Sequence, residues 1–484
     1  MSTVIDCAII GAGPAGMEAA ISASALGVQV VLIDSAPKPG GQYFKQTPDA
    51  FRVERNDSKP GKADVIFKQL AQAGVTVYQN TLVWGIFESP IPGMWHLTLK
   101  GPDAPLRLDA RTIILATGAY DSSIPFPGWD LPGVITAGAA LTLVKNQHVI
   151  PGKKILLSGT GPLQLAAAAY LHEGGADVVG VLESEQRLVT RGIRYLPAVW
   201  GQWARMKEGA GYIRSLMSGK IPYKVGWTVV EAQGEDRVRE AVIARLGRDG
   251  KTIAGSKQTV AVDTIVVGFS LTPSTEFSRL LDCEMTYLKG RGGYVPRRNE
   301  QLETSVPGIY AAGDCACIGG AGMSMIEGRI AGAAVANKIG KISDTALQEQ
   351  IRKDQVLRSR EEKFAQMLGD LFSPTDDLYR LAGEDTIICR CEQITLKEVR
   401  EAISFGAQSV GDVKSLTRSG MGNCQGRTCA SIIAHILANE TGRSVADSRY
   451  NSVRPPIHPI PMRVIEEYDL LTENDPMQTA GQHE

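Results

Sequence analysis

The chain has 484 residues, a net charge of −1 and 21% charged residues, so roughly three globular domains of about 150 residues each are expected. A near-neutral chain without a basic stripe argues against a nucleic-acid partner. Eight cysteines in so long a chain do not indicate a disulfide scaffold. They suit a reducing compartment, and we expect a cytoplasmic protein.

The sequence predicts neither secretion nor a membrane span. Residues 1–10 lack the basic start and the small-residue cleavage site of a signal peptide, and they predict a β-strand. The longest apolar stretch, residues 155–171, is interrupted by a Gly-x-Gly turn, which predicts strand, turn and helix rather than a transmembrane helix.

A glycine-rich turn follows the first predicted strand and opens a helix. In Gly11-Ala-Gly-Pro-Ala-Gly16 the first glycine allows the tight turn, the second lets the backbone approach a pyrophosphate, and the third allows close packing of helix on strand. The helix N-terminus supplies amide donors to the phosphates. The next predicted strand, 28–33, ends at Asp34, where a carboxylate can bond ribose hydroxyls. The pattern therefore predicts a dinucleotide site.

Three further segments favour FAD in this first site. Gly40-Gly-Gln-Tyr43 follows the acidic strand, residues 113–118 predict a buried strand with a small-residue end, and residues 309–315 carry a second such strand into Gly313-Asp314. Another adenine nucleotide in a structural role would satisfy the same phosphate loop. Together these elements resemble the two-dinucleotide-binding flavoprotein reductases, the superfamily of thioredoxin reductase, over residues 1–335. The expected nucleotide-binding residues are Gly11, Gly13, Pro14, Ala15, Gly16, Asp34, Ser35, Gly41, Gln42, Thr117, Gly118, Gly313 and Asp314.

The same strand–turn–helix pattern recurs later in the chain. Gly159 and Gly161 fill the first two glycine positions, Gln164 takes the third, and Glu183 takes the ribose position. A longer side chain at 164 would widen the packing of helix on strand or enter the site. Two interpretations stay open: an NAD(H) site formed by Gly159, Gly161 and Glu183, or a retained fold that holds another nucleotide or nothing.

This second domain lacks the Cys-x-x-Cys redox pair of thioredoxin reductases. Cys315 and Cys317 lie beside Asp314 in a Cys-x-Cys spacing. They are either a redox pair or small residues that pack near a flavin.

Four cysteines near the end of the chain form two close pairs, Cys389/Cys391 and Cys424/Cys429. Four thiolates are the ligand set of a [2Fe–2S] cluster. They can also hold Zn²⁺, although one intervening residue is shorter than the usual zinc spacing of about two to four, and vacant thiols are a third possibility. Three arginines, 390, 418 and 427, either raise the potential of a cluster or form a solvated surface.

This segment resembles the bacterioferritin-associated-ferredoxin type of [2Fe–2S] domain. The expected fold is therefore α/β, with two dinucleotide-binding, Rossmann-like domains of the flavoprotein reductase type and a small helical [2Fe–2S] domain. The expected divisions are 1–125 with 285–340 for the FAD-type domain, 126–284 for the second nucleotide-binding-like domain, 341–384 for a helical connector, 385–445 for the [2Fe–2S] domain, and 446–484 for an extended, proline-rich C-terminal arm.

Over nearly its full length the chain resembles the α (A) subunit of multi-subunit, dye-linked amino-acid dehydrogenases. The resemblance rests on the interdomain link 116–134, the Gly-Thr-Gly-Pro-Leu turn and the C-terminal cysteines. This family includes opine oxidases, proline and hydroxyproline dehydrogenases and hydrogen cyanide synthase. The resemblance implies a partner β subunit of the D-amino-acid-oxidase type with its own FAD, an FMN at the interface between the subunits, and in some members a small γ subunit.

Electrons would then leave through the cluster to a quinone or other acceptor, which could bring the chain to the inner face of the membrane. No side chain in the sequence is assigned as a catalytic base, which fits a subunit that relays electrons while its partner selects and oxidises the substrate. Two alternatives stay open: a stand-alone NAD(P)H-dependent flavin and [2Fe–2S] reductase, and a non-catalytic assembly subunit.

Overall fold

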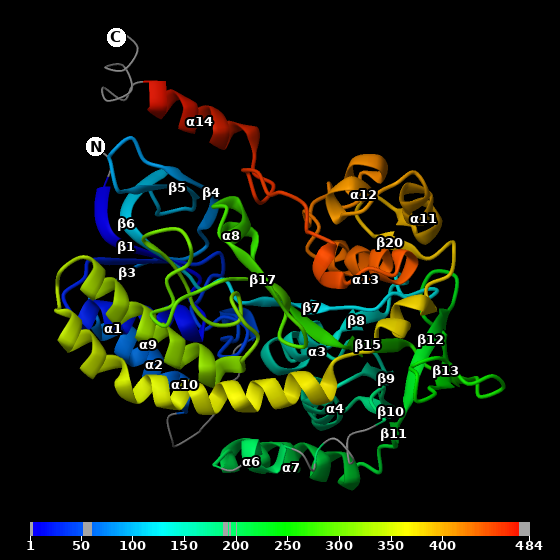
Figure 1. Ribbon diagram of the computed structural model, residues 1–484. Coiled ribbons are helices and arrows are strands. Elements are labelled where there is room, and N and C mark those ends of the chain that lie inside the picture. The colour runs from blue at the N-terminus through cyan, green and yellow to red at the C-terminus, as the bar shows by residue number, and fades with distance from the viewer. Residues whose placement is uncertain (1–2, 52–60, 187–191, 193–194, 200, 474–484) are drawn as a thin grey trace.

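The first domain is built on a seven-stranded sheet with the order β3-β2-β1-β6-β5-β4, in which β19 also pairs with β6. The computed structural model describes residues 3–51, 61–186, 192, 195–199 and 201–473 (Figure 1). Five strands, β3, β2, β1, β6 and β19, run parallel to one another, and β4 and β5 form an antiparallel hairpin on β6. The strands are β1 (Thr3–Ile10), β2 (Val30–Ile33), β3 (Thr76–Tyr78), β4 (Leu82–Glu88), β5 (Trp95–Lys100), β6 (Arg107–Leu115) and β19 (Ile309–Ala311).

Small residues bring helices α1 (Pro14–Ala25) and α9 (Gly320–Lys338) into close contact beside this sheet. A Cβ atom on Gly328 would lie 2.2 Å from the Ala15 carbonyl oxygen, and one on Gly332 would lie 2.6 Å from that of Ala19. Larger side chains at these positions would therefore push α9 away from α1. Helix α2 (Lys62–Gln72) lies on the same side (Figure 1).

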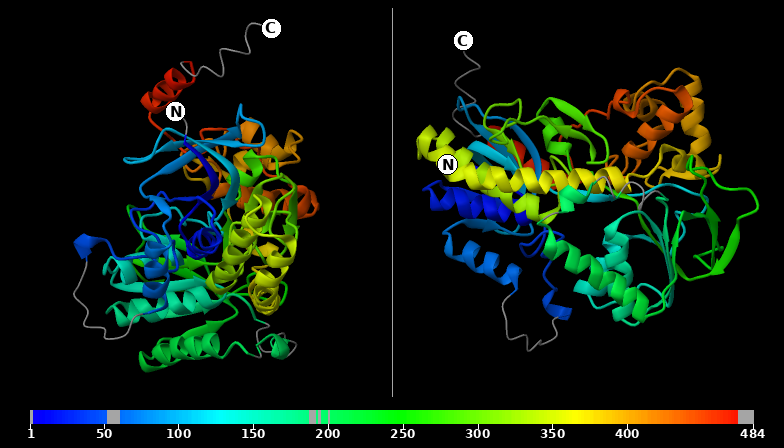
Figure 2. Two further views of the ribbon diagram at one scale, coloured as in Figure 1. Left: turned by 90° about the vertical axis from the view of Figure 1, so that its left-hand side faces the viewer. Right: turned by 60° about the horizontal axis from the view of Figure 1, so that its bottom comes forward.

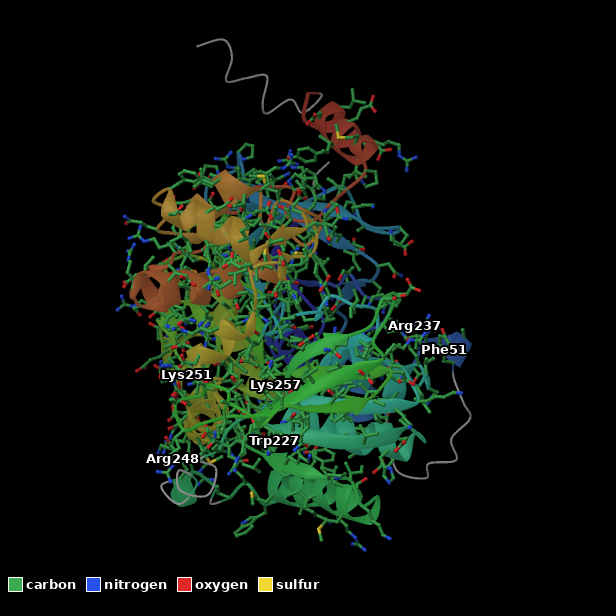
Figure 3. All side chains as sticks on the ribbon, turned by 90° about the vertical axis from the view of Figure 1, so that its right-hand side faces the viewer. Phe51, Trp227, Arg237, Arg248, Lys251 and Lys257 are labelled. Carbon is green, nitrogen blue, oxygen red and sulfur yellow. The ribbon has the colours of Figure 1, made fainter. Side chains whose placement is uncertain are left out.

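The second domain contains a five-stranded parallel sheet, order β11-β10-β9-β15-β8, and a three-stranded antiparallel sheet, β12-β13-β14. Helices α3 (Ala137–Leu141), α4 (Pro162–Glu173) and α7 (Trp203–Ser218) accompany it. Figure 3 shows Trp227, Arg248, Lys251 and Lys257 around the antiparallel sheet. The strands are β8 (Val134–Thr136), β9 (Lys154–Gly159), β10 (Asp177–Glu183), β11 (Tyr223–Val225), β12 (Trp227–Gln233), β13 (Glu240–Arg245), β14 (Gln258–Ala261) and β15 (Thr264–Gly268).

Two connections join the nucleotide-type domains. Strands β7 (Ala119–Ser122) and β16 (Ser270–Pro273) pair antiparallel in the link between them. The expected connector is helix α10 (Asp344–Phe372), which begins where the Ser343 hydroxyl accepts a hydrogen bond from the Ala346 N–H. This helix runs from α9 to the second domain (Figures 1 and 2).

The C-terminal module consists of a short hairpin, β20 (Ile387–Cys389) with β21 (Ile394–Thr395), and helices α11 (Leu396–Ser404), α12 (Val410–Thr417) and α13 (Cys429–Thr441). Thr395 with Glu398, and Ser409 with Asp412, form capping boxes that start α11 and α12. One apolar core continues from the second domain into this module, and the Trp129 indole donates to the Ile387 carbonyl at 2.6 Å. The predicted fold class is confirmed.

The prediction of an extended arm over 446–484 is wrong for part of its length. Helix α14 (Met462–Glu473) follows Pro461 at the end of the proline-rich stretch. Val464 is buried, and the Tyr468 ring meets Trp84 edge-to-face at 5.4 Å. Residues four apart share one face of a helix, so packing on the first domain stabilises a helix here. Residues 474–484 lie outside the described part. No helix among the described residues combines the length and the apolar character that crossing a membrane requires.

Candidate nucleotide and cluster sites

The first glycine loop has the geometry of a phosphate-binding turn. Gly11 has a φ of +104°, and a Cβ on Gly16 would lie 1.8 Å from the Gly11 carbonyl oxygen, so both positions require glycine. Gly13 is the N-cap of α1 and has no side chain to accept the hydrogen bonds of the first-turn amides. These amides and the helix dipole suit an anionic phosphate.

Asp34 stands at the end of β2, as the sequence predicts, and its carboxylate holds the loop. Its oxygens accept the N–H groups of Ala12 and Ala36. Burial raises the pKa of Asp34, while these two N–H groups act in the opposite direction. Gly41 lies directly across the loop, since its Cβ would be 2.8 Å from the Gly13 Cα. Ser35 and Gln42 are exposed nearby.

The Thr117-Gly118 and Gly313-Asp314 segments lie at the carboxyl ends of neighbouring strands β6 and β19, whose pairing brings them together. Asp314 is turned toward the start of α9, where its Oδ1 accepts the N–H groups of Gly319 and Gly320 at 2.9 and 3.0 Å. Asp314, which the sequence predicts as a nucleotide-binding residue, therefore also caps a helix.

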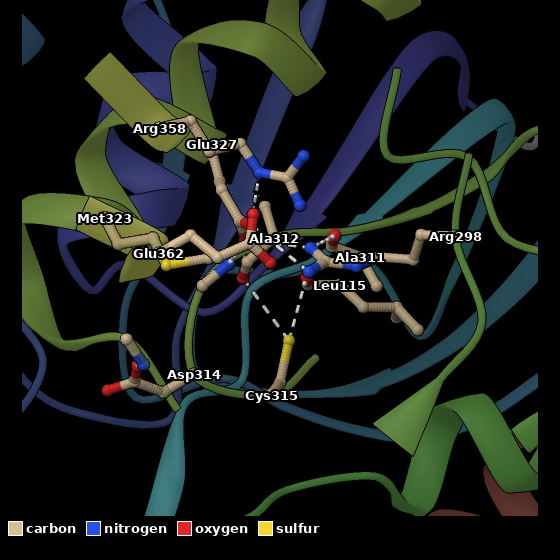
Figure 4. Close-up of polar contacts among 12 residues, drawn as sticks. Leu115, Arg298, Ala311, Ala312, Asp314, Cys315, Met323, Glu327, Arg358 and Glu362 are labelled. Carbon is tan, nitrogen blue, oxygen red and sulfur yellow. Dashed lines mark hydrogen bonds and ion pairs between the residues drawn. The ribbon is translucent and has the colours of Figure 1, made fainter. Parts of the chain in front are cut away.

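A buried network of ion pairs lies behind the Gly313-Asp314 segment, and the sequence alone did not predict it. Glu327 is fully buried, accepts from Arg298 at 2.8 Å and Arg358 at 3.0 Å, and takes the Gly313 N–H at 2.8 Å (Figure 4). Burial raises the pKa of Glu327, but Arg298 and these other partners outweigh it, and the pKa lies below its ordinary value. The one sequence signal was a glutamate within a long run of small and apolar residues.

Cys315 and Cys317 lie beside this network as buried thiols. The Cys315 sulfur donates to the carbonyls of Leu115 and Ala312 at 3.2 and 3.3 Å. Burial raises the pKa of each thiol to about 11. Protonated thiols are poor nucleophiles, so this environment favours the packing interpretation over a redox pair.

The second glycine loop is covered by another part of the chain. Gly161, at the position that should face a pyrophosphate, is buried, and a Cβ there would lie 3.3 Å from the Cβ of Phe372 at the end of α10. At the matching point of the first loop, Gly13 is half-buried and its Cβ would find only the Gly41 Cα, at 3.8 Å.

The Glu183 carboxylate also accepts hydrogen bonds from groups of its own chain, so it is not free to bond a ribose. Glu183 is fully buried, and its carboxylate accepts the N–H groups of Gly161 and Glu185 and the side-chain amide of Gln164, at 2.9 to 3.0 Å. Gln164 therefore enters the site, the second of the two outcomes expected for a long side chain there. Beyond β10 lies a cavity of about 60 Å³, whereas small-molecule sites usually measure about 300 Å³ or more.

The four C-terminal cysteines approach one another in pairs drawn from opposite ends of the module. The Cys389 sulfur accepts hydrogen bonds from the Cys429 thiol and from backbone N–H groups of Gly420, Glu392 and Cys391, which lower the pKa of Cys389 to about 5. The Cys391 sulfur receives the Cys424 N–H and lies within hydrogen-bonding distance of the Cys424 thiol. Cys389 therefore favours the thiolate, the form that ligates metals.

This pairing fits a binuclear cluster, in which each iron takes two thiolates. Among the residues that the structure describes, no three His, Cys, Asp or Glu side chains converge on a point for a single metal ion. A single Zn²⁺ needs four ligands around one centre. Glycine permits the loop, since a Cβ on Gly422 would lie 2.2 Å from the Cys391 Cβ.

The three nearby arginines differ in their surroundings. Arg418 is exposed and lies 3.6 Å from Glu392, whereas Arg390 stacks on Trp129 at 4.4 Å. Arg427 is largely buried and pairs with Glu276 at 3.2 Å. The solvated-surface interpretation therefore suits Arg418 and not Arg427.

Two parts of the chain match known protein families. Residues 5–340 match the pyridine nucleotide-disulphide oxidoreductase family, and residues 387–439 match the BFD-like [2Fe-2S] binding domain. The chain thus belongs to the pyridine nucleotide-disulphide oxidoreductases and carries an added [2Fe–2S] domain. These matches imply FAD- or NAD-type nucleotide binding and a [2Fe–2S] cluster.

The chain also matches relatives over nearly its full length, and they belong to the family that the sequence resemblance predicts. The chain is 30% identical to an opine oxidase subunit of Rhizobium meliloti (strain 1021), over 94% of this chain and 97% of that one. It is 31% identical to hydrogen cyanide synthase subunit HcnB of Pseudomonas protegens, over 94% and 96%. L-proline dehydrogenase from P. horikoshii has the same fold, with a TM-score of 0.68 at 21% identity over 96% of this chain and 80% of that one.

Proposed function

We propose that this chain is the electron-transfer subunit of a flavin-dependent opine or amino-acid dehydrogenase, and that a partner subunit oxidises the C–N bond of the substrate. The closed second glycine loop carries the proposal. Phe372 covers Gly161 and the Gln164 amide donates to Glu183, so among the described residues the chain itself fills the positions that a pyrophosphate and a ribose of a nicotinamide nucleotide would need. A chain without its own hydride donor must receive electrons from elsewhere.

The cofactors follow from the two remaining sites. FAD, or another adenine nucleotide, would bind at Gly11–Gly16, Asp34, Gly41, Thr117-Gly118 and Gly313-Asp314, with Ser35 and Gln42 at the rim. Cys389, Cys391, Cys424 and Cys429 would hold a [2Fe–2S] cluster, which accepts and releases one electron at a time. We further propose an FMN at the contact with the partner.

The partners are proposed from the family. They are a D-amino-acid-oxidase-like β subunit with its own FAD, in some complexes a small γ subunit, and a quinone or other electron acceptor. A reducing, cytoplasmic compartment fits the eight free cysteines. Relatives named as a subunit of opine oxidase and a subunit of hydrogen cyanide synthase support this assignment.

The test is an anaerobic titration of the purified, cofactor-loaded chain with NADH, NADPH and then dithionite, followed by absorption. We expect bleaching by dithionite alone. Co-expression with its β subunit should then allow bleaching by an opine or amino acid. Bleaching by NADH or NADPH would instead establish a self-sufficient reductase. A complex whose substrate oxidation proceeds unchanged with Cys424→Ser would favour the assembly-subunit alternative.

A further inference from the structure

An unbroken series of polar contacts leads from the first nucleotide site toward the cysteine loop. The Thr117 hydroxyl donates to the Ser274 carbonyl at 3.0 Å, and the Ser274 N–H donates to the Gly118 carbonyl at 2.9 Å. The Ser274 hydroxyl lies 2.7 Å from the Tyr120 hydroxyl and 2.8 Å from Glu276 Oε2. Tyr120 and Glu276 are thereby fixed to the end of the nucleotide site.

Arg427 joins this group to the cysteine loop. Its Nε lies 2.9 Å from the Tyr120 hydroxyl and 3.2 Å from Glu276 Oε1, while its Nη1 donates to the Cys424 carbonyl at 3.2 Å. The side chains of Arg427 and Glu276 are only 11% and 6% exposed. A buried, multiply bonded guanidinium is rigid, because each of its donors has a fixed direction.

The C-terminal arm closes the remaining side of Arg427. The Nη2 atom lies 3.2 Å from His458 Nε2 and 3.4 Å from the Ile457 carbonyl, and the Ile457 N–H donates to the Trp84 carbonyl at 2.9 Å. Burial and the adjacent Arg427 lower the pKa of His458 to about 4. The imidazole is therefore neutral and can accept a hydrogen bond from Arg427.

The charge at this junction is positive overall. Arg279, which is half-buried and stacks on Tyr450 at 5.6 Å, lies close enough to Glu276 and Arg427 for electrostatic interaction with both. Two guanidinium groups thus lie near one carboxylate, and only Arg427 is paired with it. In a buried site such a charge is weakly screened and acts on a neighbouring redox centre.

We propose that Arg427 is a positioning residue for electron transfer: it fixes the Cys424 loop on the nucleotide domain, and its buried charge raises the reduction potential of the cluster. Charge and hydrogen bonding around the sulfurs are the terms that set such potentials. This inference rests on the proposed function, because it requires a [2Fe–2S] cluster at the four cysteines.

The experiment is a dye-mediated redox titration of the full chain, with the reduced cluster followed by EPR. In Arg427→Gln the ratio of reduced to oxidised cluster at a fixed potential should fall about tenfold, which is about 59 mV for one electron. Arg418→Gln removes an exposed charge from the same module and should change the ratio less than twofold. Arg427→Lys keeps the charge and should retain most of the wild-type ratio.

Hydrogen exchange of residues 419–428 tests the positioning. Arg427→Gln and Tyr120→Phe should both speed exchange there, whereas Arg418→Gln should not. If Arg427→Gln does not retain the cluster, the reduction potential is measured on Arg427→Lys and the hydrogen exchange of residues 419–428 on Tyr120→Phe.

If the wild-type chain shows no EPR signal of a reduced cluster, the proposed function itself is wrong. A normal wild-type signal with equal potentials in Arg427→Gln and Arg418→Gln would overturn this inference alone. If the reduction potential of Arg427→Lys is as low as that of Arg427→Gln, the positive charge is not what raises the potential of the wild-type cluster.

Discussion

At the scale of single residues, two glycines at equivalent places have opposite surroundings. Gly13 faces the open side of its loop, and Gly161 faces Phe372. The same sequence pattern therefore forms an open loop in one domain and a filled loop in the other.

Gly13→Val should release the nucleotide from the first site and leave the fold intact. Gly13 has an ordinary φ of −75°, and its Cβ would have room, but the valine methyls would enter the phosphate space. Nucleotide released by denaturation and measured by chromatography gives the readout. Gly209→Val, whose Cβ would meet nothing within 4 Å, is the control. Full nucleotide retention in Gly13→Val would mean that this loop does not bind it.

Cys424→Ser should abolish the EPR signal of the reduced cluster while the nucleotide stays bound. A serine oxygen is a harder and weaker ligand for iron than a thiolate. Cys317→Ser alters a buried thiol beside the nucleotide site and should leave the signal unchanged. An unaltered signal in Cys424→Ser would remove this residue from the ligand set.

Glu327→Gln should lower the free energy of unfolding at pH 7 by about 3–5 kcal/mol, because it leaves Arg298 and Arg358 without a buried counter-charge. The folded-state pKa of Glu327 lies below its ordinary value. Its contribution is therefore complete above the unfolded pKa of about 4.3 and is lost as pH falls through the folded pKa.

Urea unfolding at pH 7 and below pH 4 measures this difference, which should narrow at the lower pH. Glu284→Gln breaks an exposed ion pair with Arg297 and should cost less than about 1 kcal/mol. Equal losses of unfolding free energy in Glu327→Gln and Glu284→Gln would show that the buried network stabilises the fold no more than an exposed ion pair does.

At the scale of elements, helix α10 connects the domains and also closes one of them. The sequence predicted a helical connector in this region. The place where its last residue packs was not predicted, because Phe372 and Gly161 are far apart in the chain and only the tertiary fold brings them together.

Phe372→Ala should destabilise the chain by about 2 kcal/mol, since the side chain is half-buried and leaves a cavity over the loop. NADH should still fail to bleach the cofactors, because Gln164 continues to hold Glu183. Leu357→Ala, on an exposed face of the same helix, should change stability by less than about 0.5 kcal/mol. Bleaching by NADH in Phe372→Ala would identify α10 as the sole barrier.

The sequence predicted features that depend on local patterns: both glycine turns, the acidic strand ends, the connector helix and the cysteine pairs. It did not predict features that depend on distant contacts. Asp314 caps α9, Glu327 anchors Gly313, and Arg427 reaches Tyr120 across the molecule. Helix α14 was missed because prolines 455–461 suggested an extended arm, while its stability comes from packing on the first domain.

At the scale of the whole molecule, the second domain acts as the support of the cysteine module. Ile124, Phe126 and Trp129 share one apolar core with Ile388 and Ile433. A domain whose nucleotide loop is filled thereby retains a structural role.

A chain that ends at Gly383 should aggregate or unfold at least about 5 °C below the full chain, because this shared core would be exposed to water. A chain that ends at Pro461 lacks α14 and residues 474–484 and should remain folded. Thermal unfolding with light scattering distinguishes the two. A soluble, stable chain ending at Gly383 would show that the second domain does not depend on the module.

The uneven burial of the four cysteines has a consequence for how the protein matures. Cys389 and Cys429 are 1% and 2% exposed within the shared core, while Cys391 is exposed and Cys424 half-buried. Iron and sulfide delivered to the folded chain can reach only the Cys391 and Cys424 side. A cluster-delivery protein would therefore dock over that edge and hand its cargo inward, and oxygen would attack a finished cluster from the same direction.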